Sequence, residues 1–411
     1  MLVTGLGAVT PFGLGVDPLW RGLLAGRSAI RPIAGFDAAG LDVRIAGEVP
    51  DFRPADHMDA KTARRMDRFA QFAVAAAGEA IADAALAIDD GNRERIGVVI
   101  HTGGGGLVSF EHTTRSLVLK GPKFVPLLAI PTYIPNMASS QVSITYGIHG
   151  PALTGVGACA AGVMAITEAV HLIEAGIVDV ALAGAAEACL TPTIVAGFDR
   201  AGALSHRNDD PAGACRPFAL DRDGTVLSEG ACVLVLESEA HAVRRNARAI
   251  CRAHGGATTS DAHHVTAPDP TGVHAARAMS LALARAGMHP ADIDLVAAHA
   301  TASTLGDVAE TVAIRLAFGD EADRLAVTAT KSMAGHLIGA AGALSSLVCA
   351  LAIRDRVAPP TINLETPDPD CALDHVPGGA RPMPVRAAIA NGFAFGGQNA
   401  AAVFSALRRR A

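Results

Sequence analysis

The chain has 411 residues, half of them hydrophobic and 18% charged, so it can bury a core large enough for two domains or one duplicated unit. Its net charge of −6 lacks the basic excess of nucleic-acid-binding proteins, and no stretch approaches the ~18 uninterrupted apolar residues of a membrane span, so we expect neither partner. Seven irregularly spaced cysteines, with no charged leader before an apolar run, predict a cytoplasmic protein with free thiols.

Strands and helices alternate through the first half of the chain. The opening stretch MLVTGLGAV predicts a strand that breaks into a Gly-rich turn. Apolar periodicity then predicts a helix over 68–86, a buried strand over 96–102, a helix over 162–176, and strands over 178–188 and 230–238.

The second half repeats this alternation. It predicts helices over 272–287, 306–319 and 338–355, strands over 293–300 and 325–330, and a closing hairpin over 386–407. Continuous apolar strands between helices indicate sheets buried on both faces, hence an α/β architecture. The stretches GACAAGVMAITEAVHLI and GHLIGAAGALSSLVCALAI are both small-residue turns that lead into an apolar helix, a weak sign of duplication.

Cys159 lies in the stretch TGVGACAAGVMAITEAV, where nearly bare backbone meets the start of a helix. A thiol in that position faces unpaired backbone N–H groups and the positive end of the helix dipole, which favour the thiolate. Its small neighbours leave room for a substrate. Cys159 is therefore a candidate nucleophile, although a buried core cysteine is the commoner fate of a free thiol.

His299 ends the strand predicted over 293–300, in the stretch AAHATASTLGD. Ligands bind at the carboxyl ends of strands in open α/β sheets, and Thr301 and Ser303 follow with free hydroxyls. Taken alone, a surface-loop histidine beside turn-forming hydroxyls is the more ordinary interpretation of this stretch.

Lys331 and His336 follow the next predicted strand, in a Gly-rich loop that lacks the Walker spacing of phosphate-binding loops. Glu310, on the helix before it, is expected to pair with Lys331 and hold it in place. The stretch NGFAFGGQN, residues 391–399, suggests a tight turn that presents backbone N–H groups, although taken alone it is more simply explained as a hairpin.

One cysteine at a helix start and two histidines at strand ends form a Cys-His-His constellation. With the motifs GACAAG, AHATASTLGD, TKSMAGHLIGAAG and NGFAFGGQN, the sequence resembles the elongating type II β-ketoacyl-[acyl-carrier-protein] synthases of the thiolase superfamily. The resemblance covers essentially the whole chain. It implies the thiolase fold, with two duplicated βαβαβαββ halves in five αβαβα layers, here residues 1–248 with the cysteine and 249–411 with both histidines.

The resemblance implies a catalytic set of six residues: Cys159, His299, His336, Lys331, Glu310 and Phe395. The cysteine takes the growing acyl chain as a thioester, and the histidines stabilise the enolate formed as malonyl-carrier protein loses CO₂. Backbone N–H groups of Cys159 and Phe395 form an oxyanion hole, and the lysine–glutamate pair organises the histidines. Substrate contacts are implied for Thr301, Ser303, Gly104, Phe393 and Gly396. No metal or organic cofactor is needed.

The sequence departs from the family pattern at three positions. Gly157 stands where many relatives have Thr, and Ala300 stands where Gly is usual. Gly104, in HTGGGGL, replaces a bulky residue that narrows the acyl pocket of many bacterial elongating synthases. Either Gly104 leaves a wider or longer pocket, or it merely serves a turn.

A basic stretch, DAKTARRMDRFAQFAV, predicts a helix face with the spacing i, i+3, i+4 and i+7, formed by Lys61, Arg64, Arg65 and Arg68. Most such faces are simply solvated. The resemblance implies that an acidic acyl carrier protein, acyl- or malonyl-loaded, docks there, with Arg207 and Lys123 adding to the patch.

Two pathways stay open for such an enzyme: a specialised type II polyketide or polyene system, and primary fatty-acid elongation. A non-catalytic chain-length partner subunit is a third alternative, against which Cys159 and both histidines argue. Since family members are dimers, we expect a homodimer or a heterodimer with a ketosynthase-like chain-length factor.

Overall fold

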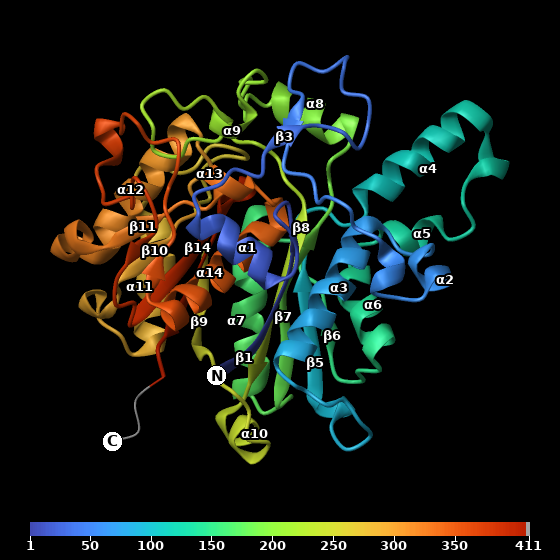
Figure 1. Ribbon diagram of the computed structural model, residues 1–411, viewed down its shortest axis with the longest axis horizontal. Coiled ribbons are helices and arrows are strands. Elements are labelled where there is room, and N and C mark those ends of the chain that lie inside the picture. Colours follow the sequence, from blue (N-terminus) through green and yellow to red (C-terminus); the bar gives the residue numbers. More distant parts are fainter. Residues whose placement is uncertain (408–411) are drawn as a thin grey trace.

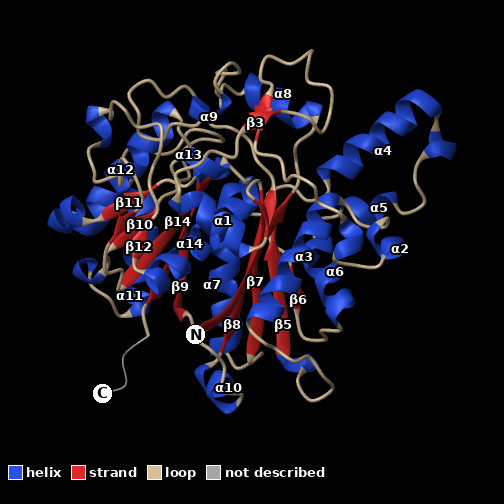
Figure 2. Cartoon of the chain, viewed as in Figure 1, coloured by secondary structure: helices blue, strands red, loops and turns tan. Residues whose placement is uncertain are grey.

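The computed structural model describes residues 1–407, and its strands form one large mixed sheet (Figures 1 and 2). Its strands are β1 (Leu2–Thr10), β2 (Gly13–Leu14), β5 (Ile96–His101), β6 (Ala152–Leu153), β7 (Val180–Glu187), β8 (Gly230–Glu237), β9 (Cys251–Ser260), β10 (Leu295–Ala297), β11 (Ala326–Thr328), β14 (Ala387–Ala394) and β15 (Gln398–Ser405). Two small antiparallel sheets pair β3 (Arg31–Pro32) with β4 (Ile45–Ala46) and β12 (Val357–Ala358) with β13 (Arg381–Pro382).

The structure contains all five helices predicted from apolar periodicity, α3, α7, α11, α12 and α14, together with nine α-helices within residues 1–407 that this periodicity did not predict. The bounds of the α-helices follow. They are α1 (Val16–Leu24), α2 (Ala60–Ala63), α3 (Arg68–Asp83), α4 (Leu107–Lys120), α5 (Ala129–Tyr133), α6 (Met137–Tyr146), α7 (Ala161–Glu174), α8 (Pro192–Arg200), α9 (Pro211–Ala214), α10 (Glu239–Arg244), α11 (Val273–Ala286), α12 (Thr304–Phe318), α13 (Lys331–Ala334) and α14 (Ala341–Asp355). Helices α4, α6 and α8 and strand β9 were not predicted from the sequence.

The two halves of the chain repeat one topology, as predicted. The first runs β1-α3-β5-α6-β6-α7-β7-β8 and the second β9-α11-β10-α12-β11-α14-β14-β15. Their strand orders in the sheet also match, β6-β5-β7-β8-β1 and β11-β10-β14-β15-β9. The halves join where β1 and β9 pair through Leu2–Arg252 and Val3–Cys251. This is the duplicated α/β fold of the thiolase type.

Helices and strands form five layers. Helix α3 covers the outer face of the N-terminal strands, α11 and α12 cover the outer face of the C-terminal strands, and α7 and α14 pack against each other between them (Figure 2). Three buried apolar clusters fill the spaces between layers. The stretch Ile338–Asp355 is long and apolar enough to cross a membrane by composition alone, but it is largely buried as this central helix.

The N-terminal strand differs from its prediction. Residues Gly5 and Gly7 do not end it in a turn, because β1 continues to Thr10. A Cβ at Gly5 would lie 2.2 Å from the carbonyl oxygen of Ala80, and one at Gly7 would lie 2.0 Å from that of Ala76. These glycines therefore let the backbone of α3 lie directly on the strand.

Two equivalent turns lead into the central helices. Short 3₁₀ turns over Ala158–Ala160 and Ile338–Ala340 precede α7 and α14. The helices cross closely, because a Cβ at Gly162 would lie 2.1 Å from the backbone nitrogen of Ala343 and one at Gly342 would lie 2.7 Å from that of Val163. The crossing brings both turns to the centre of the molecule.

Candidate active site

Cys159 and the two histidines meet in the structure. Cys159 lies in the turn before α7, His299 follows β10, and His336 follows α13. The Cys159 sulfur lies 3.1 Å from Nε2 of His336, and the two imidazole rings are perpendicular with centroids 5.5 Å apart. All three side chains are at least nine-tenths buried. Three segments distant in sequence therefore converge on one thiol.

A pocket of about 110 Å³ reaches this cluster. Its walls include the three reactive side chains and five predicted residues: Glu310, Thr301, Ser303, Phe393 and Phe395. Gly396 adjoins Phe395 in the chain, whereas Gly104 is not part of the pocket wall. In the pocket wall, Phe395 stacks on Phe198. The sequence did not identify Phe198, because no motif surrounds it.

The predicted direct pair between Lys331 and Glu310 is wrong. The Lys331 ammonium donates to the backbone carbonyl of His299, while the Glu310 carboxylate accepts from the backbone N–H of His299 at 2.8 Å and of Ala300 at 2.6 Å. No ion pair of residues 1–407 joins the two side chains. Instead, each side chain hydrogen-bonds to the backbone of His299, Lys331 at its carbonyl and Glu310 at its N–H. The side chain of Asn391, which was not predicted, donates to Glu310 at 3.1 Å.

Burial dominates the chemistry of the thiol. It raises the pKa of Cys159 to about 12, while the charge of Lys331 and the backbone N–H groups of Cys159 and Phe395 act in the opposite direction. The expected stabilisation of the thiolate at a helix start is therefore present but outweighed. Both N–H groups lie close enough to the sulfur to stabilise its negative charge, so they are also near the carbonyl oxygen of a thioester formed on Cys159.

Burial and the nearby Lys331 charge lower the pKa of His299 and of His336 well below the usual range. Both rings are therefore neutral near neutral pH and can each donate one N–H hydrogen bond without carrying charge. Within residues 1–407, no group of three or more His, Cys, Asp or Glu side chains is placed to hold a metal ion.

Two of the unusual positions have local explanations. Ala300 lies at φ 35°, in the left-handed region that favours glycine, which fits the expectation of Gly at this position and predicts some backbone strain. A Cβ at Gly157 would lie 2.6 Å from the sulfur of Met164. Gly157 therefore makes room for Met164, and a Thr there would require that side chain to move.

The prediction that Lys61, Arg64, Arg65 and Arg68 lie on one face of a single continuous helix is wrong. Helix α2 ends at Ala63 and α3 begins at Arg68, so Arg64 and Arg65 lie in the connection between them. Together with Lys61, these two arginines are exposed.

Arg68 does not belong to the exposed basic set. It bonds the buried Glu229 twice, at 2.7 and 3.0 Å, and its guanidinium lies 4.6 Å from the ring centre of Phe72. Arg207 is partly engaged as well, because it pairs with Asp221 at 3.0 Å and with Asp223 at 3.5 Å.

Comparison with known proteins agrees with this geometry. Residues 1–242 match the N-terminal domain of the Beta-ketoacyl synthase family and residues 250–365 match its C-terminal domain. The chain therefore belongs to the β-ketoacyl synthase family, and it is an acyltransferase of the ketosynthase type.

Named relatives match over nearly their whole length. The chain is 46% identical to the 3-oxoacyl-[acyl-carrier-protein] synthase 2 of Synechocystis sp. over 98% of this chain and 97% of that one, and 44% identical to that of Staphylococcus aureus with the same coverage. Among solved structures, the ishigamide ketosynthase/chain length factor is 36% identical with a TM-score of 0.92, covering 99% of this chain and 98% of that one. A type II PKS acyl-carrier protein in complex with its ketosynthase is 31% identical with a TM-score of 0.90 and 99% coverage of both chains.

We expect the rings of His299 and His336 to stay neutral when pH falls from about 7.5 to about 6, because their pKa values lie well below the ~6.5 of a free histidine. Histidine-selective ¹⁵N NMR measures this directly, with the His299→Ala and His336→Ala variants assigning the two signals. Titration of either ring with a midpoint near 6.5 would contradict the electrostatic account.

Proposed function

We propose that this protein condenses an enzyme-bound acyl thioester with malonyl-acyl carrier protein and releases CO₂, giving a β-ketoacyl-carrier protein. The observation that carries the proposal is the buried Cys159 thiol in contact with His336, beside a second neutral histidine and two backbone N–H donors. The names of the relatives support the same reaction class.

In the first step, the Cys159 sulfur attacks the thioester carbonyl of an acyl-loaded carrier. Because the pKa of the thiol is about 12, its proton must leave as the new bond forms, and Nε2 of His336 at 3.1 Å lies within reach. The N–H groups of Cys159 and Phe395 stabilise the tetrahedral oxyanion. The carrier thiol departs with a proton, and the acyl group stays on the sulfur.

In the second step, malonyl-carrier protein enters the same pocket. Its C–CO₂ bond breaks, and the electron pair becomes an enolate whose oxygen accepts hydrogen bonds from His299 and His336. Neutral donors suit this role because they stabilise developing negative charge without protonating the carbon. The enolate carbon then attacks the acyl carbonyl, and the C–S bond to Cys159 breaks. The Cys159 thiolate takes up one proton from water, which balances the loss of the malonyl carboxylate as CO₂.

Thr301 and Ser303 lie on the wall of the pocket, where a pantetheine arm would pass. Their hydroxyls lie 2.9 Å apart, and the backbone carbonyl of Ser303 accepts from the buried Arg222. The loop that presents both hydroxyls is thus fixed from behind, which favours a positioning role toward the arm.

The pathway has two candidates. Relatives at 44–46% identity are 3-oxoacyl-[acyl-carrier-protein] synthases 2, which favours fatty-acid elongation. The match to the ishigamide ketosynthase favours a specialised polyketide system as the second candidate. Primers that are saturated, or that carry β-keto groups or conjugated double bonds, distinguish the two by their relative kcat/KM.

We expect incubation with an acyl-loaded carrier protein to add one acyl group to Cys159, seen as a mass increase on the peptide that contains it. The Cys159→Ala variant should acquire no adduct and form no β-ketoacyl product, whereas Cys371→Ala, which removes a thiol distant in the chain, should keep both activities. Wild-type protein that neither becomes acylated nor releases CO₂ from malonyl-carrier protein would instead support a non-catalytic subunit.

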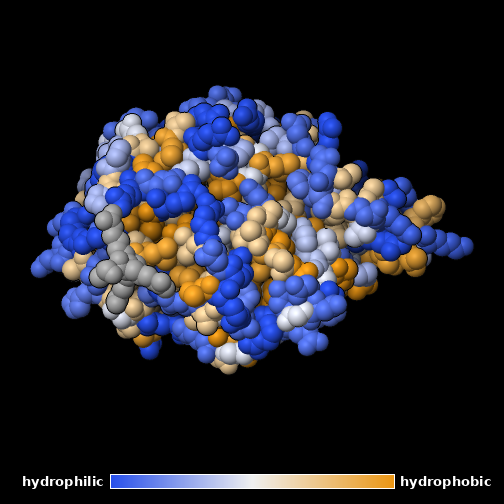
Figure 3. Space-filling view, turned by 60° about the horizontal axis from the view of Figure 1, so that its bottom comes forward, coloured by the Kyte–Doolittle hydropathy of each residue, from blue (hydrophilic) through white to orange (hydrophobic). Residues whose placement is uncertain are grey.

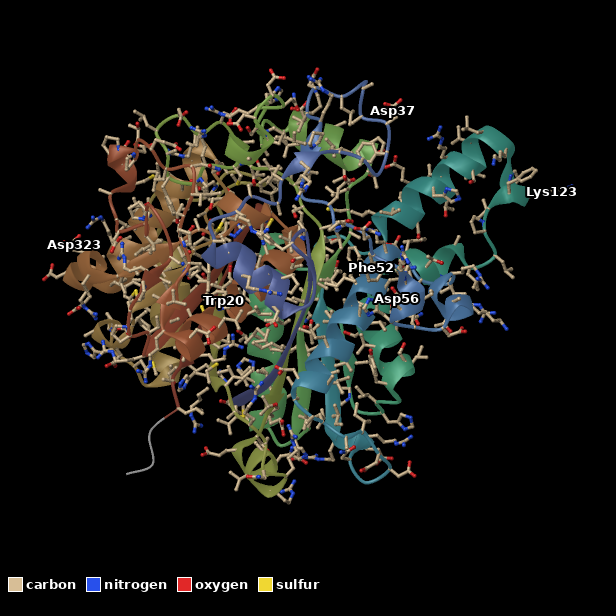
Figure 4. The ribbon with its side chains drawn as sticks, viewed as in Figure 1. Trp20, Asp37, Phe52, Asp56, Lys123 and Asp323 are labelled. Carbon is tan, nitrogen blue, oxygen red and sulfur yellow. The ribbon has the colours of Figure 1, made fainter. Side chains whose placement is uncertain are left out.

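We propose that the acidic carrier protein docks on the exposed patch formed by Lys61, Arg64 and Arg65. The chain is net acidic, so this cationic site is a local exception that suits an acidic partner. Lys123 lies at the end of the arm formed by α4 (Figure 4), farther from the patch along the chain. Arg207 contributes less than predicted, because its carboxylate partners already offset part of its charge.

We expect Arg64→Glu and Arg65→Glu each to raise KM for carrier-bound substrates by roughly three- to tenfold at low salt, with kcat little changed. The same substitution at the exposed Arg277 on α11 is the matched control. KM for a short pantetheine thioester that lacks the carrier should not respond, and an unchanged carrier KM would remove this patch from the docking site.

We propose that the protein is a dimer of two identical chains. Strand β6 forms one edge of the sheet and contacts α6. Exposed apolar side chains occur from α4 to α6 and just after β6, and Figure 3 shows apolar residues on the projecting arm. They are Phe110, Leu117, Val118, Leu119, Phe124, Leu127, Ile130, Ile144 and Val156. An edge strand flanked by one apolar face is self-complementary across a two-fold axis.

We expect the purified chain to run at about twice its 41.8 kDa mass in light scattering. Leu127→Asp, which alters a side chain that is 98% exposed, should shift the population toward monomer because it places a charge in the interface. Leu316→Asp, on the distant helix α12, should leave the mass unchanged. A wild-type monomer would favour a heterodimer with a chain-length factor.

A further inference from the structure

The space beside Gly104 is already filled. A Cβ built on Gly104 would lie 2.6 Å from Cδ1 of Leu107 and 3.2 Å from its Cγ. The side chain of Leu107 therefore occupies the place that a side chain at position 104 would take. The expected widening of an acyl compartment at Gly104 is offset by a leucine three residues further along the chain.

Leu107 also lies against the nucleophile's own surroundings. Half-buried at the first position of α4, it packs against a buried apolar cluster that contains Cys159, Cys189, Leu190 and Ile338. This cluster shares Cys159 with the pocket that holds the histidines and the candidate pantetheine contacts, but Leu107, Cys189, Leu190 and Ile338 do not line that pocket. While a malonyl arm fills that pocket in the second step, the acyl chain on the sulfur needs another apolar environment. The side chains of this cluster, which pack around Cys159, are the apolar surroundings that the chain would enter by displacing them.

The backbone around Leu107 is firmly held. The N–H of Gly103 donates to the buried Glu187 carboxyl at 2.6 Å, that of Gly105 donates to Thr102 Oγ1 at 3.0 Å, and that of Gly106 donates to a carbonyl of the 129–133 helix at 3.0 Å. Since these bonds fix the glycine loop, the leucine side chain is the part that can change its position. A growing acyl chain would meet that side chain rather than a movable backbone.

We infer that Leu107 is a specificity-determining residue that limits acyl-chain length, and that Gly104 provides the space in which its side chain lies. This inference rests on the proposed condensation reaction. It differs from the simple expectation that a missing side chain at position 104 leaves a longer compartment. Positions 104 and 107 instead limit the acyl-chain length together, because a side chain at either position would occupy the same volume.

Three variants test the pair. Leu107→Ala should accept acyl primers at least one elongation cycle longer than the longest primer that the wild-type protein extends. The kcat/KM for the first such primer should rise about tenfold or more, which is the effect of one or two methylene groups in an apolar pocket. The double variant Gly104→Ile with Leu107→Ala moves the volume to position 104 and should restore the wild-type limit. Leu316→Ala, a half-exposed leucine on α12, is the matched control.

The readout is mass spectrometry of carrier-bound products over a ladder of primers, together with acylation of Cys159 by each primer and thermal unfolding of each variant. An unchanged product range in Leu107→Ala, with wild-type condensation intact, would overturn the role of Leu107. Failure of the double variant to restore the limit would overturn the pairing with Gly104. Absence of condensation by the wild-type protein with every primer would instead reject the proposed function itself.

Discussion

The close crossing of α7 and α14 is the contact on which the site depends. Neither Gly162 nor Gly342 can carry a side chain there, because each Cα faces the backbone of the opposite helix. The crossing fixes the distance between the turn that holds Cys159 and the loop that holds His336. A larger residue at either glycine would separate the helices and lengthen the 3.1 Å contact between sulfur and imidazole.

The site at this crossing is buried, and burial sets the charge states of Cys159, His299 and His336. Desolvation disfavours the thiolate of Cys159 and the protonated forms of both histidines, so the resting site is electrically neutral except for Lys331 and its carboxylate neighbours. Glu310 and Lys331 do not neutralise each other through contact. They hold the two sides of the His299 backbone, so charge is used to position a neutral catalytic ring.

The sequence was sufficient for the parts of the fold that have a strong local signal. Helices such as α3 and α11 and the closing hairpin follow from apolar periodicity and turn residues, and the Cys-His-His set follows from motif resemblance. The sequence was misleading where tertiary contacts decide the outcome. Gly5 and Gly7 suggest a turn, but in the structure they allow α3 to pack closely on β1. Arg68 suggests part of a docking face, but it pairs with the buried Glu229, 161 residues away in the chain. No local pattern contains such a partner.

Duplication of the fold does not duplicate the chemistry, and the reason lies in the second turn. Residue 339 occupies the position in the turn before α14 that Cys159 occupies before α7, and each follows a residue at φ 45–46°. A Cβ on Gly339 would lie 2.2 Å from the backbone nitrogen of Gly103, and its own N–H donates to Glu187 at 3.1 Å. The Glu187 carboxyl therefore accepts hydrogen bonds both from this second turn and from Gly103 in the glycine loop beside Leu107. The first half therefore supplies the nucleophile, whereas the equivalent turn of the second half packs against the glycine loop and carries no reactive side chain.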